Sequence, residues 1–166
     1  MTTVWVILIA VGVFFLMEGV AWWTHRYIMH GPGWVWHRSH HEPREGLFEV
    51  NDLYGVLGAV LGTGLFVMAM LLDSWPIQAV ATGVTLYGLA YGFVHDGLVH
   101  QRWPFHWVPK NGYARRLIQA HKLHHAVQTR EGAVSFGFVF APDPHRLNAI
   151  LKARRAERAD RIEAAE

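Results

Sequence analysis

Three long stretches of this 166-residue chain carry almost no charge. Val4 to Trp23 holds a single ionisable residue, Glu18, and the stretches 53–72 and 74–94 hold none. Each has the length of about 20 residues that an α-helix needs to cross a hydrocarbon core of roughly 30 Å. The sequence therefore predicts an all-α, polytopic membrane protein with three or four transmembrane helices, at about 4–23, 53–72 and 75–94.

The first apolar run has the features of a retained anchor. A cleaved secretory signal carries positive charge before its apolar part and small residues at the cleavage site. Here Met1–Thr3 is uncharged, and the run ends in Trp22 and Trp23. We expect residues 1–166 to form one integral-membrane domain, with polar segments at 24–51 and 95–130 and a polar helical tail at 151–166.

The basic residues predict how the chain is oriented. All 15 Lys and Arg residues lie in 24–51 and 95–166, the two segments that three crossings place on one side. Positive charge marks the cytoplasmic side of a membrane. The sequence thus predicts an outward N-terminus and a cytoplasmic C-terminus. The basic residues form no groove-like patch with stacking aromatics, so no nucleic-acid partner is expected.

Ten of the twelve histidines fall in four short boxes beside the apolar runs. Neutral imidazole is the commonest protein metal ligand, and a chain without cysteine has no thiolate to offer. Ten imidazoles are too many for one ion and suit two, so we predict a di-metal site at the cytoplasmic face. The predicted ligands are His25, His30, His37, His40, His41, His95, His100, His121, His124 and His125, whereas His106 and His145 lie outside the boxes and are predicted not to be ligands.

The spacing within the boxes suggests how they bind. Histidines at i, i+3 and i+4 share one helix face, so each triplet, 37/40/41 and 121/124/125, is expected to converge on a site. The pairs 25/30 and 95/100 are five residues apart, which separates side chains by roughly 140° on an ideal α-helix. Such a pair either binds two different metals or binds one metal from a bent helix end.

Carboxylates near the boxes are candidates to support the metal-binding histidines. They are Asp96, Glu42, Glu45, Glu49 and Asp52. Other roles are open for each, such as a solvated loop charge for Glu42 or Glu45 and a helix cap for Asp52. No catalytic side chain is predicted beyond the metal ligands. The apolar segment 134–141 is too short to span a membrane and is either a buried extended segment or a re-entrant piece beside a substrate cavity.

With the boxes in view, the chain resembles the bacterial β-carotene 3-hydroxylases of the membrane fatty-acid hydroxylase superfamily. The pattern of four histidine boxes, at 25–30, 37–41, 95–100 and 121–125, points to the superfamily. The residues that flank the second and third boxes point to the carotenoid branch. The resemblance covers nearly the whole chain apart from the tail and rests on HRYIMHG at 25–31, HRSHHEPR at 37–44, FEVNDLY at 48–54, HDGLVHQRWP at 95–104, AHKLHHA at 120–126 and VSFGF at 134–138.

This resemblance implies a non-haem di-iron monooxygenase of the bacterial inner membrane. The ten histidines would hold two iron ions, with O₂ as co-substrate. The enzyme would hydroxylate each β-ionone ring at C3, converting β-carotene to β-cryptoxanthin and then zeaxanthin. Related enzymes also accept 4-keto rings, converting canthaxanthin to astaxanthin. The carotenoid would be bound from within the bilayer, and electrons would come from reduced ferredoxin or a similar donor, since the chain has no flavin or nicotinamide motif.

Three alternatives remain. The same di-iron core could hydroxylate or desaturate a fatty acyl or sterol lipid, because box spacing does not distinguish these substrates. A metal transporter would need ionisable ligands near the bilayer midplane, but the helix centres hold none, and the only candidate is Glu18, about one turn from the end of the first helix. A purely structural membrane protein leaves the boxes unexplained.

Overall fold

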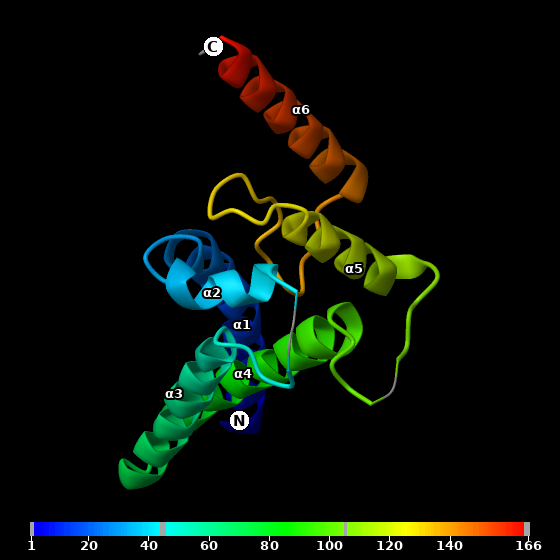
Figure 1. Ribbon diagram of the computed structural model, residues 1–166. Helices are drawn as coiled ribbons and strands as arrows, with labels where there is room; N and C mark the ends of the chain where they lie inside the picture. Colours follow the sequence, from blue (N-terminus) through cyan, green and yellow to red (C-terminus); the bar gives the residue numbers. More distant parts are fainter. Residues whose placement is uncertain (1, 44–45, 105, 165–166) are drawn as a thin grey trace.

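The computed structural model describes residues 2–43, 46–104 and 106–164, and every regular element in that part of the chain is helical (Figure 1). This confirms the all-α prediction. The elements in chain order are α1 (Thr2–Trp23), the π-helix η1 (Thr24–Met29), α2 (Trp34–His41), α3 (Asp52–Leu71), α4 (Trp75–Tyr91), the π-helix η2 (Gly92–Val99), α5 (Gly112–His125) and α6 (Pro144–Glu163).

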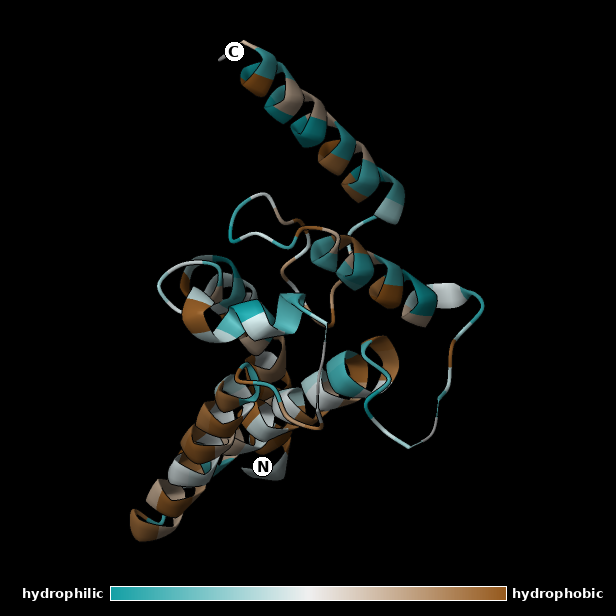
Figure 2. Cartoon of the chain, viewed as in Figure 1, coloured by the Kyte–Doolittle hydropathy of each residue, from teal (hydrophilic) through white to brown (hydrophobic). Residues whose placement is uncertain are grey.

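Three helical stretches are long and apolar enough to cross a membrane: Thr2–Met29, Asp52–Leu71 and Trp75–Val99. They match the three predicted spans, and the described residues contain no fourth. The first and third extend past their predicted ends at 23 and 94, because α1 and α4 each continue directly into a π-helix. Side chains such as Phe15 and Leu71 are 69% and 80% exposed, as a surface facing lipid requires (Figure 2).

Helix α4 packs against both α1 and α3. Its closest approach to α1 is at Gly83, where an added Cβ would lie 2.6 Å from the Ala10 carbonyl oxygen and 2.7 Å from the Val13 Cβ. Other glycines of α3 and α4 are less constrained: an added Cβ at Gly58 or Gly88 would meet nothing within 4 Å, and one at Gly62 would lie 3.5 Å from the Thr85 Oγ1. Gly83 thus allows α1 and α4 to approach each other closely.

The polar elements α2 and α5 lie beyond one end of the three spans (Figure 1). A hydrophobic core joins η2, α5 and the start of α6, with Leu98, Leu117 and Leu147 among its buried members. Helix α5 carries the triplet 121/124/125 and ends at His125. Both histidine-bearing regions are thus brought to the same end of the membrane helices.

The predicted polar tail is the outer part of α6. The helix begins earlier than expected, at Pro144, where the Asp143 side chain accepts a hydrogen bond from the backbone N–H of His145 at 3.0 Å. Leu147 and Leu151 are buried, and nearly all of the helix beyond them is exposed and projects away from the other elements (Figure 1). Residues 151–164 are the solvated helix that the sequence predicts.

The segment between α5 and α6 forms neither helix nor strand. Three of its apolar side chains, Val134, Phe136 and Phe138, are each less than a tenth exposed, whereas Phe140 is 65% exposed. The segment 134–141 is thus partly buried and irregular, and it also lines a cavity. The segment lies beside helix α1, where the polar part of the molecule begins.

Candidate metal centre

The two π-helices bring together the histidines that are five residues apart. In a π-helix the backbone N–H bonds to the carbonyl five residues earlier. The His30 N–H donates to the His25 carbonyl oxygen at 3.0 Å, and the His100 N–H donates to the His95 carbonyl oxygen at 2.9 Å. The bend allowed for at each helix end is therefore a π-turn, and both members of each pair face the same site.

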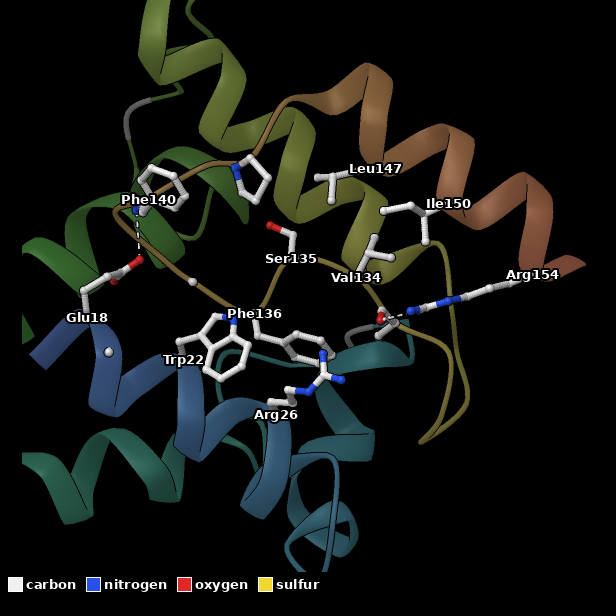
Figure 3. A pocket seen from close by; sticks show the side chains of 14 residues that line it. Glu18, Trp22, Arg26, Val134, Ser135, Phe136, Phe140, Leu147, Ile150 and Arg154 are labelled. Atoms are coloured by element: carbon white, nitrogen blue, oxygen red, sulfur yellow. Dashed lines mark hydrogen bonds between the residues drawn. The ribbon is translucent and has the colours of Figure 1, made fainter.

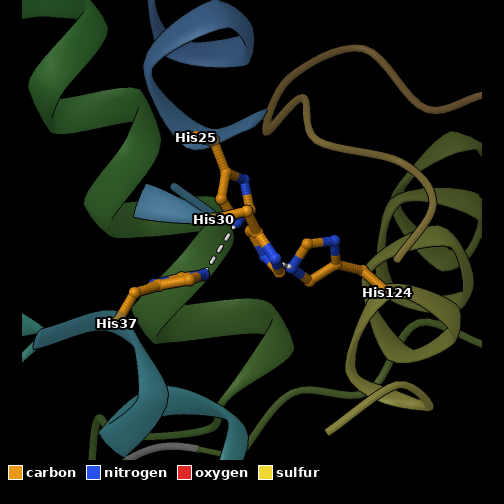
Figure 4. A group of neighbouring side chains, drawn as sticks. All are labelled: His25, His30, His37 and His124. Carbon is orange, nitrogen blue, oxygen red and sulfur yellow. Dashed lines mark hydrogen bonds between the residues drawn. The ribbon is translucent and has the colours of Figure 1, made fainter. Parts of the chain in front are cut away.

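The first site, group one, consists of five histidines. Ring nitrogens of four of them lie within 4.8 Å of one another, and Figure 4 shows these rings converging: His25, His30, His37 and His124. The first two come from η1 and its C-cap, and the others from α2 and α5. His41 completes the group, because its Nε2 lies 3.3 Å from the His37 Nε2 and 3.2 Å from the His124 Nε2.

The second site, group two, has the same composition. The four ring nitrogens that lie within 4.8 Å of one another belong to His40, His95, His100 and His121. His125 completes the group, with its Nε2 2.9 Å from the His121 Nε2. The two groups adjoin, because the His41 and His125 rings stack with their centroids 4.6 Å apart.

Each triplet divides between the two groups, which corrects the expectation that a triplet converges on one site. On α2, His37 and His41 belong to group one and His40 to group two. On α5 the division is reversed, so that His121 and His125 belong to group two and His124 to group one. Residues four apart lie nearly above one another on a helix, whereas the residue three along is turned to the other side of that line. The histidine-bearing faces of α2 and α5 are therefore directed at the boundary between the two groups, so each helix supplies ligands to both.

Hydrogen bonds at Nδ1 fix the orientation of seven of these rings. Four of the rings donate through Nδ1 to a backbone carbonyl oxygen, those of Phe136, Arg130, Val127 and Val134, at 2.8–2.9 Å, and the sequence could not reveal these contacts. The rings concerned are His25, His30, His41 and His124, all in group one. Tying Nδ1 to an acceptor leaves Nε2 to face the centre of the group.

Side chains hold the other three rings. The Nδ1 of His40 donates to Glu49 Oε2 at 2.8 Å, and the Nδ1 of His95 donates to Asp96 Oδ1 at 2.8 Å. Two of the five candidate carboxylates thus contact a histidine. Asn51, which the sequence analysis missed, accepts from the Nδ1 of His37 at 2.7 Å. Its place just before a predicted membrane helix was the available signal.

The remaining candidate carboxylates have other partners or lie outside the described residues. Asp52 accepts from both terminal nitrogens of Arg102, at 2.7 and 2.6 Å, and from the Glu49 N–H at 3.0 Å. Glu42 pairs with Arg38 on the surface of α2. Glu45 lies outside the described residues.

Burial keeps these imidazoles neutral. Desolvation is the main cause that lowers the pKa of His37 to about 2, of His125 to about 3 and of His41 to about 4. The pKa values of His40, His121 and His124 are also lowered well below the usual range, by desolvation first and by neighbouring imidazoles second. Neutral imidazole with an unprotonated Nε2 is the form that binds transition metals.

The two histidines outside the boxes take no part in either group. His106 and His145 are both exposed. This agrees with their exclusion from the predicted ligands.

Aromatic rings cover the two groups. The Phe138 ring stacks on His25 of group one at 5.1 Å and meets the edge of His95 of group two at 5.4 Å. Tyr91 stacks on His95 at 4.7 Å and touches Phe138 at 4.6 Å. These rings lie where η2 leaves the membrane helix, so they close the groups on that side.

Two cavities flank the groups. One, of about 390 Å³, is lined by four histidines of the groups, His40, His41, His100 and His125, together with Lys122 and other polar residues. The other, of about 420 Å³, lies between α1, the segment 133–142 and α6 (Figure 3). Two of its lining residues contact the histidine groups: the Phe136 ring packs against His25 and His124, and the Val134 carbonyl oxygen accepts from His124.

Comparison with known proteins adds the family context. A protein-family model described as fatty acid hydroxylase matches residues 10–142, a range that contains all ten box histidines. A protein of Pseudescherichia vulneris named beta-carotene hydroxylase is 58% identical over 138 residues, covering 83% of this chain and 78% of the relative. No solved structure matches.

More distant relatives carry similar names. A beta-carotene hydroxylase of Pantoea ananas is 54% identical over 143 residues, covering 86% of this chain and 81% of the relative. A protein of Arabidopsis thaliana named beta-carotene 3-hydroxylase 2, chloroplastic, is 39% identical over 137 residues, which cover 81% of this chain and 45% of the relative.

Proposed function

Because the chain belongs to the fatty acid hydroxylase family, we propose that it is an O₂-dependent β-carotene 3-hydroxylase. It hydroxylates β-ionone rings at C3 and so converts β-carotene to β-cryptoxanthin and then to zeaxanthin. The observation that carries this proposal is the 51–58% identity to bacterial proteins named beta-carotene hydroxylase over most of the chain.

Ten histidines hold two iron ions in this proposal, five in each group. The donor set fits iron, since imidazole suits this metal and the chain has no cysteine. The rings also fit a cation at each centre, because several Nε2 atoms face one another at 2.9–3.3 Å while Nδ1 atoms are tied to oxygen acceptors. The iron ions, when bound, supply the activation of O₂ that hydroxylation of a C–H bond requires.

The protein's own side chains tune this site. Glu49 and Asp96 accept the Nδ1 protons of His40 and His95, which raises the basicity of these ligands and supplies negative charge beside group two. Phe136 and Phe138 are buried against the rings and exclude water from that side. A site that is dry on its membrane side suits an apolar substrate.

The substrate reaches the site from within the bilayer. A carotenoid is apolar, and the three membrane helices lead to the end of the molecule that carries both groups. We place the protein in the bacterial inner membrane with the groups and the C-terminus at the cytoplasmic face, on the support of the Lys and Arg distribution. Reduced ferredoxin or a similar protein on that side supplies the electrons.

Expression in bacteria that accumulate β-carotene tests the substrate. We expect β-cryptoxanthin and zeaxanthin, and astaxanthin in cells that accumulate canthaxanthin, with an inactive control provided by the His40→Ala variant. Membranes that contain the wild-type chain but no 3-hydroxylated carotenoid would contradict the proposal. The family description favours one alternative, hydroxylation or desaturation of a fatty acyl or sterol lipid, which the same cells would reveal as a modified lipid.

A further inference from the structure

Glu18 is the only ionisable residue in the first apolar run, and its carboxylate is saturated with hydrogen bonds. Its Oε1 accepts from the backbone N–H of Phe138 at 3.0 Å, of Val139 at 3.2 Å and of Phe140 at 2.8 Å. Figure 3 shows the bond to Phe140. Its Oε2 accepts from the hydroxyl of Tyr87 on α4 at 2.6 Å. One side chain of α1 thus joins two membrane helices to the segment between α5 and α6.

The surroundings of Glu18 are shaped to receive a carboxylate. Successive backbone N–H groups that point into one concavity form an anion-binding nest. Gly137 completes it, since an added Cβ there would lie 2.5 Å from Glu18 Oε1 and 3.1 Å from the Phe140 carbonyl oxygen. An ionisable residue inside a membrane helix is costly and is retained where it has a specific partner. This partner is the backbone at 138–140.

The segment that Glu18 holds also orients group one. The Val134 carbonyl oxygen accepts from the Nδ1 of His124, and the Phe136 carbonyl oxygen accepts from the Nδ1 of His25, both at 2.9 Å. Between them, Ser135 has a φ of 58°, a conformation that costs energy unless its neighbours hold it in place. Both carbonyls are therefore fixed by a strained segment whose far end is bound to Glu18.

We propose that Glu18 is a positioning residue for group one. By binding the nest at 138–140, it holds segment 134–140 so that Val134 and Phe136 present their carbonyls to His124 and His25. The effect of Glu18 on metal binding rests on the proposed function, in which group one holds iron. The effect of Glu18 on the position of segment 134–140 is independent of the proposed function.

Two variants separate positioning from folding. Glu18→Leu removes every acceptor and places a residue that favours membrane insertion in α1. Glu18→Gln keeps one carbonyl oxygen for the nest and turns its amide to the Tyr87 hydroxyl, so it serves as the conservative variant. Glu157→Gln on the exposed part of α6 is the matched control.

Two measurements on the purified full chain in detergent decide the question. Hydrogen exchange of the 138–140 amides, measured without metal, should be about tenfold faster or more in Glu18→Leu and close to wild type in Glu18→Gln. Mössbauer spectra after loading with ⁵⁷Fe should show selective loss of the iron signal of group one in Glu18→Leu. That signal is identified as the one that His25→Ala loses and His95→Ala keeps.

The outcomes distinguish the two proposals. The positioning role would be overturned if the 138–140 amides of Glu18→Leu exchanged at the wild-type rate and the variant kept both iron signals. It would also be overturned if Glu18→Leu lost both iron signals equally because the protein no longer folded. If wild type binds no iron while exchange still rises in Glu18→Leu, the proposed function fails and the structural tether stands.

Discussion

At the scale of single residues, the two groups differ in the charge that supports them. In group one the Nδ1 acceptors are Asn51 and backbone carbonyls, all neutral, whereas in group two Glu49 and Asp96 are carboxylates. A carboxylate that accepts a ligand's proton increases the basicity of that ligand. Group two is thus the group in which carboxylates would supply negative charge to a bound metal ion.

Replacing Glu49 by Gln tests this support. The variant keeps a hydrogen-bond acceptor for His40 but removes the charge, and we expect turnover to fall by about 10- to 100-fold. Glu42→Gln is the control, because Glu42 pairs only with Arg38 on the surface of α2. Zeaxanthin formation per milligram of membrane protein is the measurement. Equal activity of both variants would show that the Glu49 charge has no role.

Burial of neutral histidines makes the metal-free protein sensitive to acid. The folded pKa values of His37, His125 and His41 lie at about 2, 3 and 4, against about 6.5 in the unfolded chain. Below pH of about 6.5 the unfolded state therefore binds more protons than the folded state, and stability falls by about 1.4 kcal/mol per pH unit for each such group.

The expected result is a thermal midpoint of the metal-free protein that is level between about pH 7.5 and 8.5 and drops steeply below about pH 6. Thermal unfolding in detergent, followed by tryptophan fluorescence, measures it. A midpoint at pH 5 equal to that at pH 7.5 would mean that these rings are protonated in the folded state or exposed to solvent.

Side-chain type and spacing allowed the ten histidines to be predicted, and two of the five candidate carboxylates. The seven Nδ1 contacts show why the other parts of the site could not be predicted from the sequence. A backbone carbonyl such as that of Phe136 leaves no mark in the sequence, because any residue there supplies the same oxygen. Glu45 lies outside the described residues and stays a prediction.

At the scale of helices, the five-residue spacing of 25/30 and 95/100 has a physical explanation. It is the repeat of a π-turn, in which the N–H of residue i+5 bonds to the carbonyl of residue i. The sequence left open whether each pair binds two different metals or one metal from a bent helix end, and it did not predict the π-turn. The division of each triplet was not predictable, since it depends on where α2 and α5 point relative to both groups.

The α1–α4 contact gives a test at this scale. Gly83→Ala forces a methyl group against Ala10 and Val13, and overpacking of this kind costs roughly 1–3 kcal/mol. We expect a lower thermal midpoint in detergent and lower iron content, because α1 and α4 lead into η1 and η2. Gly88→Ala, where an added Cβ meets nothing within 4 Å, should leave both unchanged. If the two variants behaved alike, the close approach at Gly83 would be wrong.

At the scale of the whole molecule, both halves of the chain build both sites. Each half contributes a membrane helix, a π-helix with one histidine inside it and one directly after it, and a further helix with three. The halves then exchange one histidine each, His40 and His124. The membrane spans were predictable from the length of the uncharged stretches. The placement of both histidine-bearing regions at the same end of the spans was predictable from the distribution of Lys and Arg. The exchange is a property of tertiary packing alone.

The orientation across the membrane is a separate prediction. Since the chain has no cysteine, single-cysteine variants give clean reporters. A thiol introduced at Thr3 should react with an impermeant reagent added to intact cells, and one at Glu157 should react only after the membrane is opened. Reaction of the thiol at Glu157 in intact cells, with the thiol at Thr3 reacting only after the membrane is opened, would reverse the assigned face for the histidine groups.

The iron content of the purified protein tests the central claim most directly. Two adjoining five-histidine sites predict about two iron ions per wild-type chain, and about one in His40→Ala, which removes a ligand of group two alone. His145→Ala, an exposed histidine outside both groups, should retain about two. Active wild-type protein without stoichiometric iron, or a His40→Ala variant that retains both ions, would contradict the account.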